Sequence, residues 1–159
     1  MALRRLVVLG LLGAVVATTA PAAAESFDST GVHSTLRSHH GVAVLVPSGW
    51  HVVTRKLTPC IDPTERLTVA GRGALVMLQE RRRAVPGEFP VRPSKFELRG
   101  SPEYMECCAP LARRGWMLRF EDNGRSFYAY VYLGGAGTRE QTLEILDSLR
   151  IRHASATAA

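Results

Sequence analysis

The chain has 159 residues, a formal net charge of +6 and three cysteines. That length is enough for one domain with a core of its own, so a second domain is not expected. A modest positive charge spread along the chain is more typical of solubility than of a nucleic-acid surface, and we expect no nucleic-acid partner.

The first 24 residues have the three parts of a secretory signal peptide. Two arginines precede an apolar run over residues 6–17, and Ala22 and Ala24 suit signal peptidase, which predicts cleavage before Glu25. The alternative is an uncleaved anchor, but the run is shorter than the ~20 apolar residues that span a bilayer. We therefore expect a secreted, extracytoplasmic protein of the cell envelope, with no stable membrane anchor after cleavage.

Residues 25–40 mix serine, threonine, glycine and histidine without apolar periodicity, which predicts a flexible leader. A single domain is expected over residues 41–152, followed by a disordered tail over residues 153–159. Within the domain, Val42–Val46 is apolar and β-branched, and a Pro-Ser-Gly turn separates it from residues 50–54. These two segments are expected to form a first pair of strands.

A second hairpin is predicted from residues 66–70 and Ala74–Glu80, with Gly71, Arg72 and Gly73 at its tip. Three arginines follow, and prolines then interrupt regular structure in a loop. Residues 95–98 are a candidate for a return to the sheet after this loop.

The clearest local pattern is a hairpin over residues 116–133. Asn123 and Gly124 form the favoured two-residue turn, because both positions need a positive φ that these residue types tolerate. Placing Asp122 opposite Arg125 pairs Phe120 with Phe127, Leu118 with Ala129, and Trp116 with Val131. One face of this hairpin is then apolar, and the other carries Met117, Arg119, Glu121, Tyr128, Tyr130 and Tyr132.

A last helix is predicted after the glycine-rich segment that ends this hairpin. Thr138 followed by Gln141 matches a capping box, and Leu143, Leu146 and Leu149 recur at helical spacing. Strands followed by a terminal helix indicate an α+β fold, an antiparallel β-sheet with a C-terminal helix packed on one face.

Two short segments near the ends of the predicted domain carry a resemblance. Residues 46–50 read Val-Pro-Ser-Gly-Trp, a strand that ends in a Pro-x-Gly-Trp turn, and residues 143–150 form a helix that ends in a Ser-Leu segment. In both respects the chain resembles the PsbP-like group of small α+β domains. PsbP-like domains are generally accessory or binding modules, so the resemblance implies binding rather than catalysis.

A wider resemblance covers most of residues 41–152. Residues 57–60 read Leu-Thr-Pro-Cys, residues 106–108 read Glu-Cys-Cys, and residues 124–130 read Gly-Arg-Ser-Phe-Tyr-Ala-Tyr. Together they resemble a group of small secreted proteins of high-GC Gram-positive bacteria. This likeness brings no catalytic site with it.

The cysteines predict one disulfide, because oxidation prevails outside the cytoplasm. Adjacent cysteines rarely bridge each other, so Cys60 is expected to pair with Cys107 or Cys108 across almost fifty residues. Such a closure stabilises a domain by roughly 2 to 5 kcal/mol. The cysteine left over is a buried thiol, an intermolecular link or a reactive thiol.

Two catalytic alternatives centre on Cys107 and Cys108. A thiol nucleophile would need a base, for which His51 is the candidate inside the domain, and a zinc site would need one of His39, His40 or His51 beside the cysteines. Adjacent cysteines lack the usual spacer for one zinc ion, and oxidation disfavours thiolate ligands. We expect no catalytic residue, no metal and no cofactor.

The tyrosine side of the predicted hairpin is the candidate binding surface. Phenol rings beside a guanidinium can hold a sugar, a peptide or a planar ligand through stacking and polar tips. The alternative is that the tyrosines cover the second side of the sheet beneath a loop or the leader. The candidate ligand-binding residues are Arg119, Tyr128, Tyr130 and Tyr132.

These observations together favour a non-enzymatic binding or accessory module, stapled by one disulfide and monomeric. Its ligand is an unknown protein, peptide or small molecule. The alternatives are a thiol- or zinc-dependent enzyme at Cys107 and Cys108, and a structural or oligomerising envelope protein linked through the odd cysteine.

Overall fold

The computed structural model describes residues 34–105, 108–135 and 137–153. By its internal contacts the chain divides into Met1–Thr30 and Gly31–Ala159, and every described residue belongs to the second unit. The expected signal peptide, the first part of the leader, Cys107 and the end of the tail lie outside the described residues.

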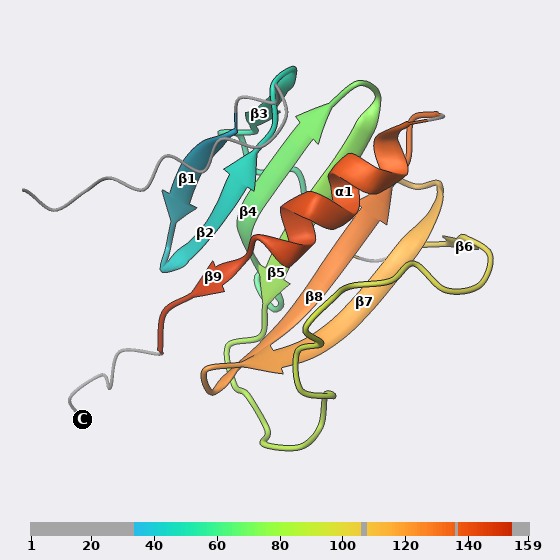
Figure 1. The fold of residues 1–159 in the computed structure, drawn as a ribbon. Helices are drawn as coiled ribbons and strands as arrows, with labels where there is room; N and C mark the ends of the chain where they lie inside the picture. Colours follow the sequence, from blue (N-terminus) through green and yellow to red (C-terminus); the bar gives the residue numbers. More distant parts are fainter. Residues whose placement is uncertain (1–33, 106–107, 136, 154–159) are drawn as a thin grey trace, which may run out of the picture. The chain divides into compact units, whose positions relative to one another are not determined.

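The fold is α+β, with antiparallel strands and a helix near the C-terminal end (Figure 1). The larger sheet has the order β3-β4-β5-β8-β7-β6, and the smaller sheet has the order β1-β2-β9. The larger sheet comprises β3 (Trp50–Val52), β4 (Thr64–Gly71), β5 (Ala74–Glu80), β8 (Arg125–Tyr132), β7 (Arg114–Asp122) and β6 (Glu103–Tyr104). The smaller comprises β1 (Thr35–His39), β2 (Val42–Val46) and β9 (Arg150–Ile151), and the helix is α1 (Thr138–Asp147).

Two tight hairpins form the centre of the larger sheet. The β4–β5 turn places Arg72 at φ 52° and Gly73 at φ 75°, and the β7–β8 turn places Asn123 at φ 52° and Gly124 at φ 71°. Both turns therefore use the left-handed backbone that a two-residue hairpin requires. The register from Asp122↔Arg125 to Trp116↔Val131 confirms the predicted pairing.

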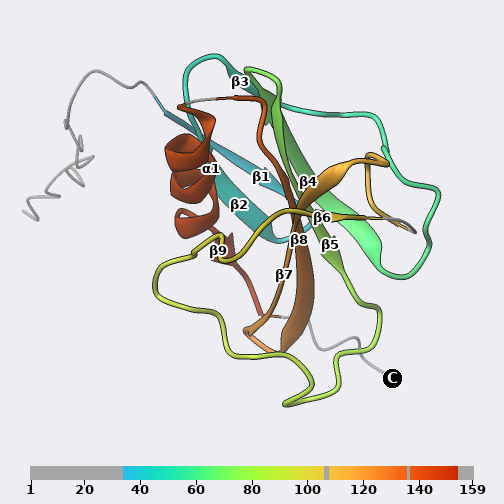
Figure 2. The same cartoon turned by 90° about the vertical axis from the view of Figure 1, so that its right-hand side faces the viewer.

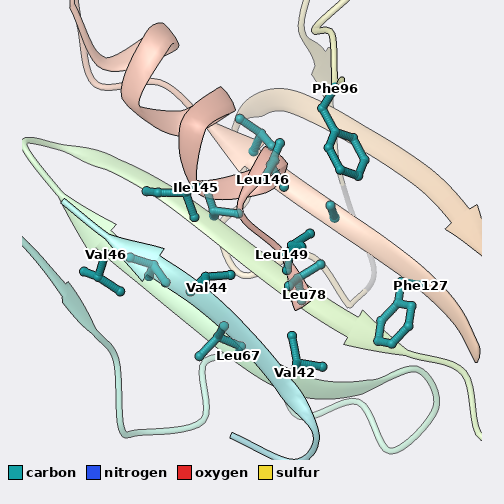
Figure 3. Close-up of a cluster of buried hydrophobic side chains, with 14 of the residues drawn as sticks. Val42, Val44, Val46, Leu67, Leu78, Phe96, Phe127, Ile145, Leu146 and Leu149 are labelled. Atoms are coloured by element: carbon teal, nitrogen blue, oxygen red, sulfur yellow. The ribbon is translucent and has the colours of Figure 1, made fainter. Parts of the chain in front are cut away.

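The main core lies between the larger sheet, the helix and strand β2. Alternate valines of β2 and the buried stripe of α1 meet aliphatic and aromatic residues of β4, β5 and β8 (Figure 3). The labelled members are Val42, Val44, Val46, Leu67, Leu78, Phe96, Phe127, Ile145, Leu146 and Leu149. We call this side of the larger sheet the helix face, and it confirms the expected packing of a C-terminal helix on one face.

The start of the helix differs from the expected capping box. Gly137, with φ 86°, occupies the N-cap position, and no side chain caps the first turn. Thr138 is already inside the helix on its buried side, so its hydroxyl donates to the Gly135 carbonyl oxygen at 2.8 Å instead. None of the described helical residues forms a helix long and apolar enough to cross a membrane.

Two expectations at the N-terminal side of the domain need correction. Residues Thr35–His39 of the predicted leader form β1, which pairs with β2 through a turn at His40 and Gly41. All five β1 residues are exposed, so no apolar alternation marks this strand in the sequence. The expected first pair of strands does not pair internally, because β2 bonds to β1 and β9 while β3 bonds to β4.

Residues 95–98 do not return to the sheet as a strand. Phe96 and Leu98 are nevertheless buried in the helix-face core, and the Phe96 amide donates to the Asp147 carboxylate at 2.8 Å. The apolar residues at alternate positions, 96 and 98, imitate the pattern of a strand, but here they belong to a loop whose side chains fill the core.

An arginine joins the two ends of the domain to the sheet. The Arg125 side chain is only 7% exposed and donates to both carboxylate oxygens of Glu80 at 2.8 Å. It also donates to the carbonyl oxygens of His40, Gly41 and Arg152 at 3.2 to 3.3 Å. Burial alone would raise the pKa of Glu80, but the hydrogen bonds and charges of Arg125 and Arg66 outweigh it and lower that pKa.

Candidate functional site

The side of the larger sheet opposite the helix carries the three tyrosines of β8, and we call it the tyrosine face. Loops rather than regular elements cover it, and Figure 2 shows the loop that follows β3 on the opposite side of the sheet from α1. The buried apolar members of this face are Leu75, Met77, Met105, Tyr130 and Tyr132, with Leu57 and Ala109 packed against them.

A disulfide links two of these covering loops. Cys60, in the loop after β3, is bonded to Cys108, in the segment after β6, with Cα atoms 5.4 Å apart. This confirms the pairing of Cys60 and selects Cys108 from the two candidates. The Gln79 side chain, buried on the tyrosine face, donates to the Cys108 carbonyl oxygen at 2.6 Å and so fastens the linked loops to the sheet.

The disulfide oxidises two of the three cysteines on which the catalytic alternatives depend. Cys60 and Cys108 are oxidised, so neither is a thiolate, and Cys107 lies outside the described residues. His39 Nδ1 donates to the Arg66 carbonyl oxygen at 2.9 Å, and His51 is exposed on β3. Within residues 34–105, 108–135 and 137–153, no group of three His, Cys, Asp or Glu side chains could hold a metal ion.

A small hollow of about 290 Å³ is lined in part by His39 and His40. His39, His40, Arg55, Lys56 and Arg66 contribute to its lining, so its charge is mainly positive. Desolvation, then the neighbouring charges of His39 and Arg66, lower the pKa of His40. The acid in this hollow, Glu65, is engaged by the Leu57 amide and the Thr68 hydroxyl, at 2.9 and 2.6 Å.

The innermost of the candidate tyrosines is part of the packing. Tyr132 is fully buried, and its hydroxyl donates to the Leu111 carbonyl oxygen at 2.8 Å. The Arg113 guanidinium lies 5.0 Å from the centre of its ring. Burial raises the pKa of Tyr132, which favours the neutral phenol that this hydrogen bond needs.

The other candidates lie progressively nearer the solvent. Tyr130 is 5% exposed and reaches the lining of a surface hollow. Tyr128 is half-buried, with its ring edge-on to Phe89 at 5.0 Å and stacked on Tyr130 at 6.4 Å. Arg119 is exposed, with its guanidinium 5.9 Å from the centre of the Tyr128 ring. The predicted guanidinium–phenol contact is therefore present on this face.

Two larger hollows, of about 480 and 610 Å³, adjoin along the outer side of β7. Both are lined by Met117 and Leu118 of the strand and by Glu97 and Arg99 of the segment opposite. The first also includes Tyr104, Met105, Gly115, Trp116 and Tyr130, and the second includes Pro90, Val91, Lys95, Phe96 and Arg119. We call the two hollows together the β7 groove.

The walls of the β7 groove combine exposed apolar groups with charges. Val91 is 83% exposed, Tyr104 is 55% exposed and Met117 is 39% exposed. Arg99 pairs with Glu97 at 2.7 Å, and Lys95 pairs with Asp147 at 3.2 Å. Arg119 has no carboxylate within ion-pair distance among the described residues. Apolar groups of a ligand suit these side chains, and a negatively charged group suits the Arg119 end of the groove, whereas Glu103 at the other end would repel it.

Sequence reasoning identified one wall of the groove and missed the other. Arg119 and Tyr130 were candidates because they share one side of a recognisable hairpin. Val91 and Arg99 come from an irregular segment, and Tyr104 comes from the two-residue strand β6, so none of them has a periodic signal. The only sequence signal for this wall is the presence of Val91 and Tyr104 in a proline-containing stretch.

Comparison of the chain with protein-family models, curated proteins and solved structures finds no match in any of the three.

Proposed function

We propose that this chain is a secreted, non-enzymatic binding or accessory module that holds its ligand in the β7 groove. The observation that carries the proposal is the groove itself, two adjoining hollows lined by Val91, Tyr104 and Met117 beside Arg119, which has no carboxylate partner among the described residues. Apolar side chains gathered in a concave surface gain free energy when a ligand removes them from water.

The chemical state of the nearby groups supports binding over turnover. Glu121 accepts hydrogen bonds from the amides of Gly87 and Phe89 at 3.2 Å. Cys60 and Cys108 are joined in the disulfide. Each of these groups therefore serves a structural contact that a general acid, base or nucleophile would have to leave.

The proposal includes export and a PsbP-like accessory domain. A disulfide between distant loops fits an oxidising compartment, which supports export. An antiparallel sheet with a C-terminal helix on one face supports the PsbP-like assignment. Peptide mapping of protein from the exporting host tests the first point, because the mature N-terminus should be Glu25.

A thermal-shift screen tests the binding role. The mature chain is screened against defined panels of peptides, oligosaccharides and small aromatic acids, and a binder should raise the midpoint of thermal unfolding. The same shift should appear in Leu36→Lys, which alters an exposed leucine on β1, and disappear in Met117→Lys. A shift that survives both Met117→Lys and Tyr104→Lys would assign the ligand to another surface and refute the proposal.

A further inference from the structure

The outer edge of β7 is paired at its two ends and open between them. Asp122 and Arg125 flank the two-residue turn, so Phe120 and Leu118 direct their backbone groups toward β8. At one end, the Glu121 amide donates to the Pro90 carbonyl oxygen and its own carbonyl accepts from the Arg92 amide, both at 2.8 Å. Glu121 thus directs its backbone groups away from β8.

At the other end, β6 pairs with the first residues of β7. Glu103 lies opposite Gly115, and the Met105 amide donates to the Arg113 carbonyl oxygen at 3.4 Å. Because backbone direction alternates along a strand, Met117 and Arg119 also face outward, between these two paired ends. No described residue bonds to the backbone N–H or C=O of either one.

The segment beside this gap does not fill it. Continuing the β6–β7 register would place Ser101 opposite Met117 and Arg99 opposite Arg119. Instead the segment turns toward the helix face, where Leu98 is buried, and the Gly100 carbonyl accepts from the Trp116 indole at 3.3 Å. The β7 groove occupies the space that a paired strand would otherwise take.

We propose that this gap binds an extended peptide of a partner protein by strand addition, a conclusion that rests on the binding role proposed above. The N–H and C=O groups of Met117 and Arg119 would pair with the peptide backbone, as open sheet edges do in other strand-addition complexes. Affinity then comes from the backbone pairing, and selectivity comes from the side chains that enter the two hollows.

The groove lining defines the chemistry of the peptide. A residue opposite Met117 enters the hollow that Tyr104 and Tyr130 line, so it should be apolar. A residue opposite Arg119, two positions along, meets a cation without a carboxylate partner among the described residues, so it should be acidic. The residue between them faces Leu118 and Phe96 and should be apolar as well.

Two other occupants of the gap, a second copy of the chain and its C-terminal tail, lack this complementarity. A second copy that pairs the open stretch of β7 with itself would place Met117 or Arg119 directly opposite Arg119, and neither side chain carries a carboxylate. The last six residues of the chain contain no acidic residue. The cation at Arg119 therefore favours an apolar peptide of a partner with one acidic residue placed opposite it.

The test uses the mature chain and two five-residue probes of opposite sequence, acetyl-Thr-Glu-Val-Val-Thr-amide for antiparallel pairing and acetyl-Thr-Val-Val-Glu-Thr-amide for parallel pairing. Each spans residues 116–120, between the stretches that β6 and the Pro90 segment already pair, and places its glutamate opposite Arg119 and a valine opposite Met117. Amide hydrogen exchange is followed by NMR. At least one probe should slow exchange at Met117 and Arg119 at least about tenfold, while Leu118 and Phe120, which β8 already protects, should not change.

Two variants at one position separate backbone pairing from charge. Arg119→Ala should weaken probe binding about three- to tenfold, because only the ion pair is lost. Arg119→Pro also removes the outward amide, which lies outside the β8 pairing, and should weaken binding at least a further tenfold. A probe with lysine in place of glutamate should bind more weakly than the original.

Several outcomes would overturn this inference. They include unchanged exchange at Met117 and Arg119 with both probes at millimolar concentration, or equal binding of the lysine probe. Slow exchange in the free chain that depends on concentration would assign the gap to a second copy, and slow exchange independent of concentration would assign it to this chain itself. If a Met117→Lys-sensitive ligand leaves both amides unprotected, the inference fails while the proposed function stands.

Discussion

The two faces of the larger sheet are covered in different ways. On the helix face, α1 and β2 place aliphatic side chains at regular intervals over β4, β5 and β8. On the tyrosine face, loops lie over a mixture of methionine, glutamine and tyrosine side chains. Regular elements satisfy their own backbone groups and are held mainly by apolar burial, whereas loops need separate attachments.

The attachments of the tyrosine face are individually visible. The disulfide joins two loops, Gln79 binds the Cys108 carbonyl, Tyr132 binds the Leu111 carbonyl, and Glu65 accepts from the Leu57 amide. Because polar bonds and one covalent link carry this cover, its stability should respond to different changes from those that affect the helix face.

The largest effect is expected from the centre of the helix face. Leu146 is fully buried, so Leu146→Ala should lower the free energy of unfolding by about 2–5 kcal/mol through lost burial and an unfilled cavity. Leu143 on the same helix is only partly buried, and Leu143→Ala should lower it by less than about 2 kcal/mol. Chemical denaturation measures both, and equal losses would contradict this account of the core.

Removal of the disulfide should weaken the tyrosine face selectively. In Cys60→Ser/Cys108→Ser, the free energy of unfolding should fall by about 2–4 kcal/mol, because the unfolded chain is no longer constrained across 48 residues. Hydrogen exchange under native conditions should accelerate in residues 53–63 and 108–113 while α1 keeps its protection. Equal acceleration in α1 would show that the two faces do not unfold separately.

An ion pair on the helix face should make stability depend on pH. Since the folded protein lowers the pKa of Glu80, the resulting stabilisation is complete above the ordinary glutamate value of 4.5 and is lost as pH falls through the lower folded value. Glu80→Gln should cost about 1–3 kcal/mol at neutral pH and flatten this acid limb.

Glu88 provides the matched control for this change, because it pairs with Arg81 at an exposed site. Glu88→Gln should change the free energy of unfolding by less than about 0.5 kcal/mol and leave the pH dependence intact. An acid limb unaltered in Glu80→Gln would assign it to other carboxylates.

The smallest change in the free energy of unfolding is expected when a tyrosine hydroxyl is removed from the tyrosine face. Tyr132→Phe removes the bond to the Leu111 carbonyl and should lower the free energy of unfolding by about 0.5–1.5 kcal/mol. Tyr128→Phe removes a hydroxyl that makes no hydrogen bond to a described residue, and its unfolding should match the wild type. Thermal and chemical unfolding should agree on this order.

The hairpins were predictable because their signals are local. Asn123 and Gly124 specify the turn, and the turn fixes the register of every residue pair along β7 and β8. The last helix was predictable from its apolar spacing, but its cap was not, since Thr138 lies one position inside the helix. Strand β1 escaped prediction because its side chains are exposed and its pairing uses backbone groups alone.

The candidate site was predictable only where it depends on alternation. Alternation placed Arg119 and the tyrosines on one face, but burial of Tyr132 depends on loops that come from distant parts of the chain. The pairing of Cys60 with Cys108 likewise depends on how two distant loops are placed over the sheet. The wall of the β7 groove that Val91, Arg99 and Tyr104 form could not be predicted either, because its position also depends on contacts between distant parts of the chain.

The position of Arg125 has a consequence for the cooperativity of the domain. Its guanidinium binds carbonyls at His40 and Gly41 near one end of the described chain and at Arg152 near the other. Fraying of either end leaves a buried cation short of acceptors, which penalises the other end at the same time. The β1–β2 turn and strand β9 thus open together. A truncation just before residue 152 would therefore also destabilise the turn at residue 40.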